Sequence, residues 1–305
     1  MNLATIDIGT NTTLLLVASA AGETVEVLAD RAEITRLGRG IGQQGALAPE
    51  AIARTLAALR DYAAIARQHG APIAAVGTEA LRRAANAADF LGPAAEILGG
   101  EVEVIDGERE AALTFRAVAT SFPDAGKGRL VVVDIGGGST EIVVSSDGEV
   151  EFRVSLPLGS VRLTEAHVHH DPPTAAEHAA IDAAIDAALA TVPLPPPPAT
   201  LVGVAGTVTS LAAMALELPS YDPARVHGYR LSRADLGRQV ARLGASTQPE
   251  RERMTGLDPR RADVIFAGAL ILDRIATAAG VPEIRVSDRG IRWGLLYERL
   301  AQSVP

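Results

Sequence analysis

Two segments of the sequence place an acidic residue directly before a glycine-rich turn that ends in hydroxyl side chains. Asp7–Thr12 reads Asp-Ile-Gly-Thr-Asn-Thr, and Asp134–Thr140 reads Asp-Ile-Gly-Gly-Gly-Ser-Thr. Glycines allow backbone N–H groups to approach an anion closely, and hydroxyl groups add further donors. Either segment by itself could equally be an ordinary turn between two strands, with no role in binding. Because both occur between similar apolar strands, the pair favours phosphate binding.

The acid in each segment indicates a cation, because a carboxylate cannot bind phosphate directly. Oxygen ligands shared with water and phosphate are typical of Mg2+, with Mn2+ as the alternative. We therefore predict that Asp7 and Asp134 lie beside a divalent cation. Glu141 comes seven residues after Asp134 on the next strand, from which its side chain could reach the same cation. The alternative for Glu141 is a solvent-facing strand residue.

Two further candidates follow predicted strands. Arg82 lies where a strand passes into a helix, and it is well placed there to meet a phosphate. Glu110 lies in the first turns of a helix that begins near Asp106. Acidic residues in a first turn also complement the helix dipole, so Glu110 by itself is compatible with a purely structural role.

The elements that must position these residues form the same pattern twice. Leu3–Ile8 and Thr13–Ala18 are apolar runs around the first glycine turn, and Arg129–Val133 and Glu141–Ser145 flank the second. Strand, glycine turn and strand together are typical of a β-hairpin. A single repeat over about half the chain predicts duplicated lobes, since a solenoid needs several short repeats.

We therefore expect an α/β fold with two duplicated lobes and a cleft between them. Residues 1–122 are expected to form the first lobe and residues 123–290 the second. A C-terminal helix at about 291–305 is expected to pack back on the first lobe.

Composition limits the classes of function. The chain has 305 residues and a net charge of −9, which argues against nucleic acid as a general partner. It contains no cysteine, which excludes disulfides and thiolate metal sites and fits a cytoplasmic location. Its N-terminus reads as a buried strand, and no apolar run is long enough to span a membrane. Lys127 is the only lysine, so side chains that hold phosphate must be arginines, and a P-loop is excluded.

Seven segments of the chain resemble the exopolyphosphatase and guanosine pentaphosphate phosphohydrolase family, and they occur in the family's order over nearly the whole chain. The resemblance implies the actin-like ATPase superfamily with ribonuclease H-like lobes, in the family's short form. The segments are Asp7–Thr12, Gly77–Arg82, Asp106–Ala111, Asp134–Thr140, Leu156–Leu163, Gly206–Thr209 and Ser287–Arg292.

The resemblance also implies roles by position. Glu110 corresponds to the family's general base, Arg82 to its phosphate-binding arginine, and Asp134 and Glu141 to its magnesium-associated acids. The phosphate-binding residues would be Thr10, Asn11 and Thr12 in the first segment and Gly136, Gly137, Gly138 and Ser139 in the second.

Two residues depart from the family's pattern. Ala205 replaces a common glycine, and Trp293 stands where an acid is frequent.

A homodimer is plausible from the family alone. We also expect an arginine-lined cleft that draws on Arg82, Arg109, Arg116 and Arg289, because the chain as a whole is acidic.

The sequence therefore predicts an exopolyphosphatase that hydrolyses the terminal phosphate of inorganic polyphosphate, with no membrane partner. Hydrolysis of guanosine pentaphosphate, which would connect the protein to ppGpp metabolism, is the alternative substrate. A kinase of the same fold and a non-catalytic regulator that binds the alarmone remain as alternatives of other classes.

Overall fold

The computed structural model describes residues 1–21, 24–197 and 199–302. The chain divides into two compact units, and we describe each by itself. Unit 1 consists of Met1–Ala117 together with the segment from Ile291, and unit 2 consists of Val118–Gly290. The C-terminal helix expected at about 291–305 is observed as α13 (Ile291–Gln302) in unit 1, and residues 303–305 lie outside the described part of the chain.

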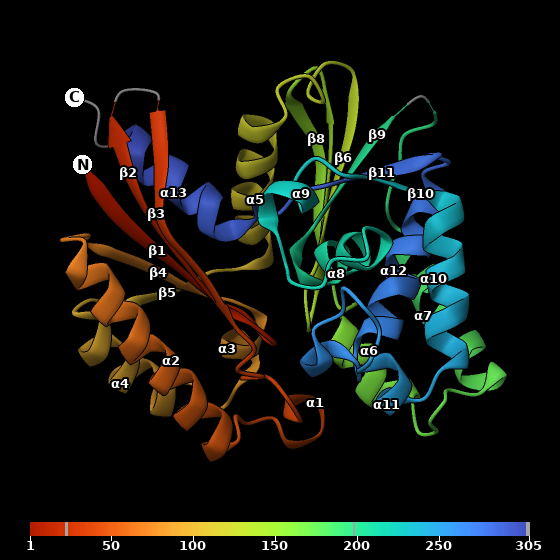
Figure 1. Ribbon diagram of the computed structural model, residues 1–305, viewed down its shortest axis with the longest axis horizontal. Helices are drawn as coiled ribbons and strands as arrows, with labels where there is room; N and C mark the ends of the chain where they lie inside the picture. The colour runs from red at the N-terminus through yellow and green to blue at the C-terminus, as the bar shows by residue number, and fades with distance from the viewer. Residues whose placement is uncertain (22–23, 198, 303–305) are drawn as a thin grey trace. The chain divides into compact units, whose positions relative to one another are not determined.

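Unit 1 is built on a five-stranded mixed sheet (Figure 1). The first three strands form an antiparallel meander, and two further strands run parallel to the first. The sheet order is β3 (Thr24–Glu33), β2 (Thr13–Ala21), β1 (Asn2–Ile8), β4 (Ile73–Gly77) and β5 (Val102–Val104).

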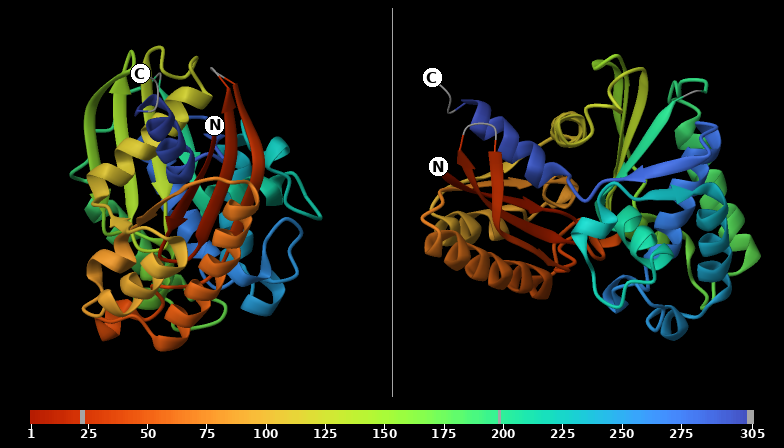
Figure 2. Two further views of the ribbon diagram at one scale, coloured as in Figure 1. Left: turned by 90° about the vertical axis from the view of Figure 1, so that its left-hand side faces the viewer. Right: turned by 45° about the horizontal axis from the view of Figure 1, so that its top comes forward.

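Helices cover both faces of this sheet, and Figure 2 shows α2 (Pro49–Gln68) and α13 on opposite sides of it. Alternate residues of β1 point to opposite faces. Ile6 packs in one apolar cluster with residues of α2 and α4 (Ala88–Leu98), whereas Leu3 packs in another with residues of α13. Asp7 therefore shares its face of β1 with Leu3, which is the face that α13 covers.

Three further helices belong wholly or mainly to unit 1. They are α1 (Ile41–Gln44), α3 (Glu79–Arg83) and α5 (Gly107–Ser121), whose last residues enter unit 2.

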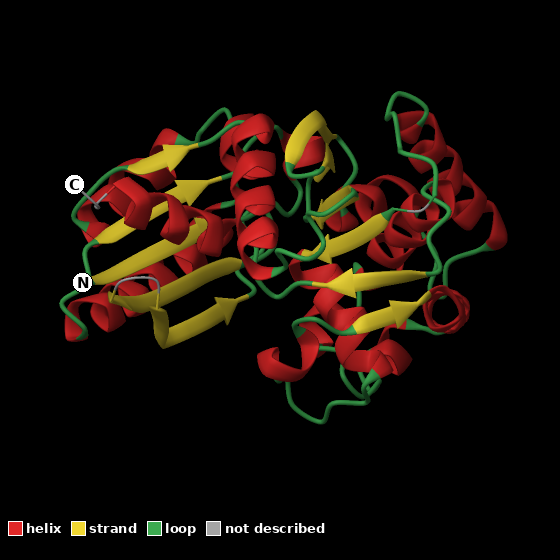
Figure 3. Cartoon of the chain, turned by 90° about the horizontal axis from the view of Figure 1, so that it is seen from above, coloured by secondary structure: helices red, strands yellow, loops and turns green. Residues whose placement is uncertain are grey.

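Unit 2 repeats the strand pattern of unit 1 and adds one edge strand, as the two yellow sheets of Figure 3 show. A three-stranded meander is again followed by strands parallel to its first strand. The sheet order is β10 (Arg230–Ser232), β11 (Glu283–Val286), β9 (Thr200–Val204), β6 (Arg129–Ile135), β7 (Thr140–Ser146) and β8 (Glu149–Leu156). The prediction of duplicated α/β lobes is confirmed.

The helices of unit 2 pack in layers on its sheet. α8 (Ala205–Ala215) and α12 (Ile265–Ala278) contact the strands, and α7 (Ala175–Leu189) and α10 (Arg233–Ala245) contact α12. α12 is buried along most of its length because it lies between the sheet and these outer helices. The remaining helices are α6 (Ser160–His167), α9 (Pro223–Val226), α11 (Gln248–Arg251) and a 3-10 turn at Pro259–Arg261.

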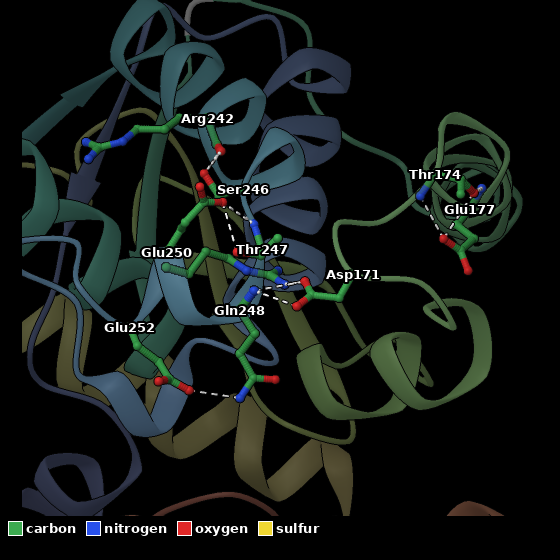
Figure 4. Close-up of polar contacts among 10 residues, drawn as sticks. Asp171, Thr174, Glu177, Arg242, Ser246, Thr247, Gln248, Glu250 and Glu252 are labelled. Atoms are coloured by element: carbon green, nitrogen blue, oxygen red, sulfur yellow. Dashed lines mark hydrogen bonds and ion pairs between the residues drawn. The ribbon is translucent and has the colours of Figure 1, made fainter.

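Hydrogen bonds and an ion pair connect the segment after α6 to α11 in unit 2 (Figure 4). The carboxylate of Asp171 accepts hydrogen bonds from the backbone N–H of Gln248, at 2.8 and 2.9 Å, and from Nη2 of Arg251 at 3.0 Å. The Arg251 side chain is buried, and burial lowers its pKa. Asp171 therefore supplies the charge that keeps this guanidinium inside the unit. In the described part of the chain, no helix has the length and apolar character needed to cross a membrane.

Candidate active site

The candidate residues of unit 1 gather at one edge of its sheet. Ile8 at the end of β1 pairs with Gly77 of β4, and Gly77 pairs with Val104 of β5. Because these three strands are parallel, the segments that follow them leave the sheet side by side. The first glycine turn, the start of α3 and the start of α5 are therefore neighbours.

The first glycine turn is held in a fixed shape by backbone hydrogen bonds. Gly9 N–H donates to the Thr12 carbonyl at 3.0 Å, and a Cβ at position 9 would lie 2.8 Å from that oxygen. The carbonyls of Thr10 and Asn11 accept from the N–H groups of Gly38 and Arg36, both at 2.9 Å. In a trans peptide the following N–H points the opposite way from the carbonyl. The N–H groups of Asn11 and Thr12 therefore point away from residues 36–38.

Asn11 carries an unused donor in this turn. The residue is only 7 % exposed, and its Nδ2 has no hydrogen-bond partner among the described residues. A buried donor without an acceptor costs about 1–3 kcal/mol. An anion with several acceptor oxygens would satisfy it, which is the property expected of a phosphate-binding turn.

Arg82 and Glu110, which are 28 residues apart in the sequence, form a direct ion pair. Nη1 of Arg82 donates to Oε1 of Glu110 and also to the carbonyl of Ile105, at 2.6 Å. Glu110 is 4 % exposed, whereas about a quarter of the Arg82 side chain reaches the surface. The pair combines a buried carboxylate of fixed orientation with a guanidinium that a ligand can reach.

Glu79 is a buried acid to which the sequence pattern assigned no role. Its Oε2 accepts a hydrogen bond from Oγ1 of Thr10 at 3.4 Å, and its Oε1 lies 3.2 Å from Nη1 of Arg83. Glu79 thus connects the start of α3 to the first glycine turn. The sequence feature that could have marked Glu79 as a candidate is its position between Gly77 and Arg82, inside the segment that also contains Arg82.

Unit 2 places two buried carboxylates opposite one another. Asp134 on β6 pairs in register with Glu141 on β7, and both are buried. Directly opposed residues of an antiparallel pair have Cβ atoms about 5 Å apart, and like charges there repel. Ser155 donates to Oε1 of Glu141 at 2.6 Å, which orients that side chain. A solvent-facing position for Glu141 is thereby excluded.

The second glycine turn is held by the start of α6. Ser160 N–H donates to the carbonyl of Gly136 at 3.0 Å, and Val161 N–H donates to that of Gly137 at 2.9 Å. Nε of Arg162 donates to the carbonyl of Gly138 at 2.7 Å. Because these three carbonyls face α6, the N–H groups that follow them point away from it. The backbone N–H groups that point away from α6 are those of Gly137, Gly138 and Ser139.

Close packing explains why glycine occurs at the start of α6. A Cβ at Gly159 would lie 2.3 Å from the carbonyl oxygen of Gly137. No side chain fits there, so the backbone of Gly159 can support the glycine turn directly.

The donor set of unit 2 fits a hard divalent cation. Mg2+ is usually held by one or two carboxylates together with water and substrate phosphates. Asp134 and Glu141 supply two such carboxylates. No group of three or more His, Cys, Asp or Glu residues suited to a metal occurs within the described ranges. In unit 1, the residue opposite Asp7 is Leu14, so Asp7 has no second carboxylate across its hairpin.

Arg109 does not have the position that we expected for it. Its Nη1 and Nη2 donate to the two carboxylate oxygens of Glu298, with the Nη1 bond at 2.6 Å. These hydrogen bonds raise the pKa of Arg109 and lower that of Glu298. Both groups therefore stay charged near neutral pH, and Arg109 serves an ion pair within unit 1 rather than a phosphate.

Comparisons with known proteins place nearly the whole chain in one family. A family model described as the Ppx/GppA phosphatase family matches residues 16–303. Exopolyphosphatase 2 of Mycobacterium tuberculosis is 40 % identical over 96 % of this chain and 97 % of its own length. Exopolyphosphatase 1 of the same organism is 31 % identical over 98 % of this chain and 88 % of its own length.

Solved structures resemble the fold over its whole length. A Ppx/GppA family member from Aquifex aeolicus has a TM-score of 0.85 at 34 % identity, and covers 100 % of this chain and 99 % of its own. An exopolyphosphatase from Cytophaga hutchinsonii has a TM-score of 0.90 at 28 % identity, and covers 99 % of this chain and 98 % of its own.

Proposed function

The chain belongs to the Ppx/GppA phosphatase family, and from this premise we propose that it is an exopolyphosphatase. It would remove the terminal phosphate of inorganic polyphosphate by metal-assisted attack of water. The relatives at 40 % and 31 % identity are named exopolyphosphatases, which favours polyphosphate over guanosine pentaphosphate. The observation that carries the chemistry is the buried Glu110 carboxylate, paired with Arg82 beside the first glycine turn.

Phosphate binding is assigned to the donors of both turns. In the first turn, these are the N–H groups of Asn11 and Thr12, together with Nδ2 of Asn11. The Thr10 hydroxyl would join them by exchanging its acceptor, Oε2 of Glu79, for a phosphate oxygen. In the second turn, they are the N–H groups that point away from α6. Arg82 adds a positive charge that a terminal phosphate can reach. The assigned residues are Thr10, Asn11, Thr12, Arg82, Gly136, Gly137, Gly138 and Ser139.

Asp134 and Glu141 would hold the divalent cation, with Asp7 as a further acidic contributor. The repulsion between two opposed carboxylates, which a cation relieves, supports this assignment. Carboxylate oxygens suit both Mg2+ and Mn2+, so the assignment is to a hard divalent cation, with Mg2+ as the one to test first. When bound, the cation would neutralise charge on the phosphate oxygens.

Glu110 is assigned as the general base. Its carboxylate would accept a proton from water as the water oxygen attacks the terminal phosphorus. The bond from that phosphorus to the bridging oxygen then breaks, and the shortened polyphosphate leaves. The hydrogen bond from Arg82 fixes the carboxylate in one orientation, and burial protects it from bulk water. A general base in this position contributes about 10²- to 10⁴-fold to the rate.

Glu110→Gln tests this proposal, because it keeps the shape of the side chain and removes the base. Phosphate release from a ladder of polyphosphate lengths and from guanosine pentaphosphate is measured with the same Mg2+ concentration. We expect kcat to fall about 10³-fold with polyphosphate, while KM changes little. Glu108→Gln, on the exposed side of the same helical turn, is the matched control and should retain turnover.

Two results would contradict the proposal. Wild-type turnover in Glu110→Gln would remove Glu110 as the base. Transfer of phosphate from ATP to an added acceptor, with polyphosphate left intact, would instead identify a kinase of this fold.

A further inference from the structure

The helix that carries Glu110 is attached to α13 at two points, one on each side of the carboxylate. Arg109 precedes Glu110 and is bound through both terminal nitrogens to Glu298 of α13. Leu113 lies one turn after Glu110, and its carbonyl oxygen would be 1.9 Å from a Cβ at Gly294. A helix held at two points within one turn can neither slide nor rotate freely.

The contact at Gly294 brings two helix backbones together. Because no side chain fits between α13 and the Leu113 carbonyl, the separation of the two helices is set by backbone atoms. Apolar packing surrounds this point, since Leu113 and Leu295 belong to the same buried cluster. Gly294 therefore determines how deep α5 lies in unit 1.

The Arg109–Glu298 pair has the geometry of a strong ion pair. Both guanidinium ends meet both carboxylate oxygens, which is the bidentate arrangement that gives the most directional ion pairs. The Glu298 side chain is 12 % exposed, so water competes little for it. Glu103 also approaches Arg109, but at 3.9 Å and with 47 % of its side chain exposed. Glu298 is the partner that holds Arg109 in place.

α13 is itself fixed to the strand that carries the first glycine turn. Oγ1 of Thr5, which is fully buried in β1, donates to the backbone carbonyl of Arg292 at 2.8 Å. Thr5 lies two residues before Asp7 and five before Thr10 on the same strand and turn. α13 thus connects the element that holds Glu110 to the element that holds the phosphate-binding turn.

We propose that Glu298 is a positioning residue for the reaction, which acts on Glu110 through Arg109 and the α5–α13 contact. This inference rests on the proposed function, in which Glu110 is the general base. Misplacement of a reacting group by about 1 Å can lower a rate about 10²-fold. Loosening α5 should therefore reduce kcat, with only a small effect on KM, because the first glycine turn that binds phosphate is not part of α5 and Arg82 is also held by the carbonyl of Ile105.

Glu298→Gln is the main variant, because it keeps the size of the side chain and removes its charge. We expect kcat with polyphosphate to fall about 10-fold or more, with KM within about twofold of wild type. Glu103→Gln is the matched control, since it removes the same charge beside the same guanidinium without breaking the bidentate pair. Its kcat should equal that of wild type.

A double-mutant cycle separates positioning from general loosening of the fold. If Glu298 acts only through Glu110, adding Glu298→Gln to Glu110→Gln should leave the residual rate unchanged. A further decrease by the same factor as in wild type would overturn the inference. So would equal losses in Glu298→Gln and Glu103→Gln, or a change confined to KM. Full activity of Glu110→Gln would instead refute the proposed base.

Discussion

The two glycine turns have the same backbone hydrogen bond but differ in the side chains that surround it. In both, the first glycine N–H donates to the carbonyl three residues later at 3.0 Å, in Gly9–Thr12 and in Gly136–Ser139. The acid before each glycine faces a different residue across the hairpin. Asp134 faces Glu141, whereas Asp7 faces Leu14. The same hairpin thus carries a carboxylate pair in unit 2 and a single carboxylate beside an apolar residue in unit 1.

The support behind the turns differs as well. The second turn rests on the N-terminus of α6, which occupies the carbonyls of its three glycines. The first turn rests on residues 36–38, and it retains the buried amide of Asn11 as a donor. The two turns thus share one backbone hydrogen bond but are surrounded by different side chains. Unit 2 has two opposed carboxylates beside its turn, whereas unit 1 has the buried amide donor of Asn11 in its turn.

Asp134→Asn and Asp7→Asn test this comparison with the same change at equivalent positions. Asp134→Asn should lower kcat about 10³-fold, because it leaves Glu141 without its opposing carboxylate and weakens the cation site. Asp7→Asn should cost about 10-fold or less, since no second acid lies across its hairpin. Turnover is measured over a Mg2+ titration for each variant. Equal losses in the two variants would mean that the two turns contribute equally to the cation.

Asn11→Ala tests the donor that only the first turn retains. Loss of a hydrogen bond to a charged group costs about 1.5–3 kcal/mol, so KM for polyphosphate should rise about 10-fold or more. The free protein should not lose stability, because the amide nitrogen has no partner among the described residues. Steady-state kinetics and urea unfolding check the two effects. A lower unfolding free energy together with an unchanged KM would show that Asn11 is structural.

Ala205→Gly sharpens the comparison at the next strand-to-helix junction. In unit 1, the residue after β4 is Thr78, with a φ of −115°. In unit 2, the residue after β9 is Ala205, with a φ of +70°, which disfavours a side chain. Glycine there should raise the free energy of unfolding by about 1 kcal/mol. Ala215→Gly at the other end of α8 should lower it by a similar amount. Equal effects of both substitutions on urea unfolding would contradict the strain at Ala205.

Much of the architecture was predictable because its signals are local. Apolar runs around each Asp-Ile-Gly segment predicted the two hairpins, and their repetition predicted the duplicated lobes. The opposition of Asp134 and Glu141 also follows from local geometry, since a tight turn between two strands sets their register. Arg82 and Glu110 were found as candidates from their places after strands, although their direct contact was not predicted.

The partners of several charged side chains were decided only by the tertiary structure. Arg109 was expected to meet phosphate, but it binds Glu298, which lies 189 residues away in the sequence. Local periodicity carries no information about such a pair, because the packing of α5 against α13 brings the two side chains together. Asn11 is similar: its sequence position shows a polar residue in a turn, but only packing decides that its amide is buried. By itself, the sequence determined which chemical groups the protein has and where its strands turn. The fold decided which of these groups are desolvated and paired, because burial and ion pairing depend on contacts between distant segments.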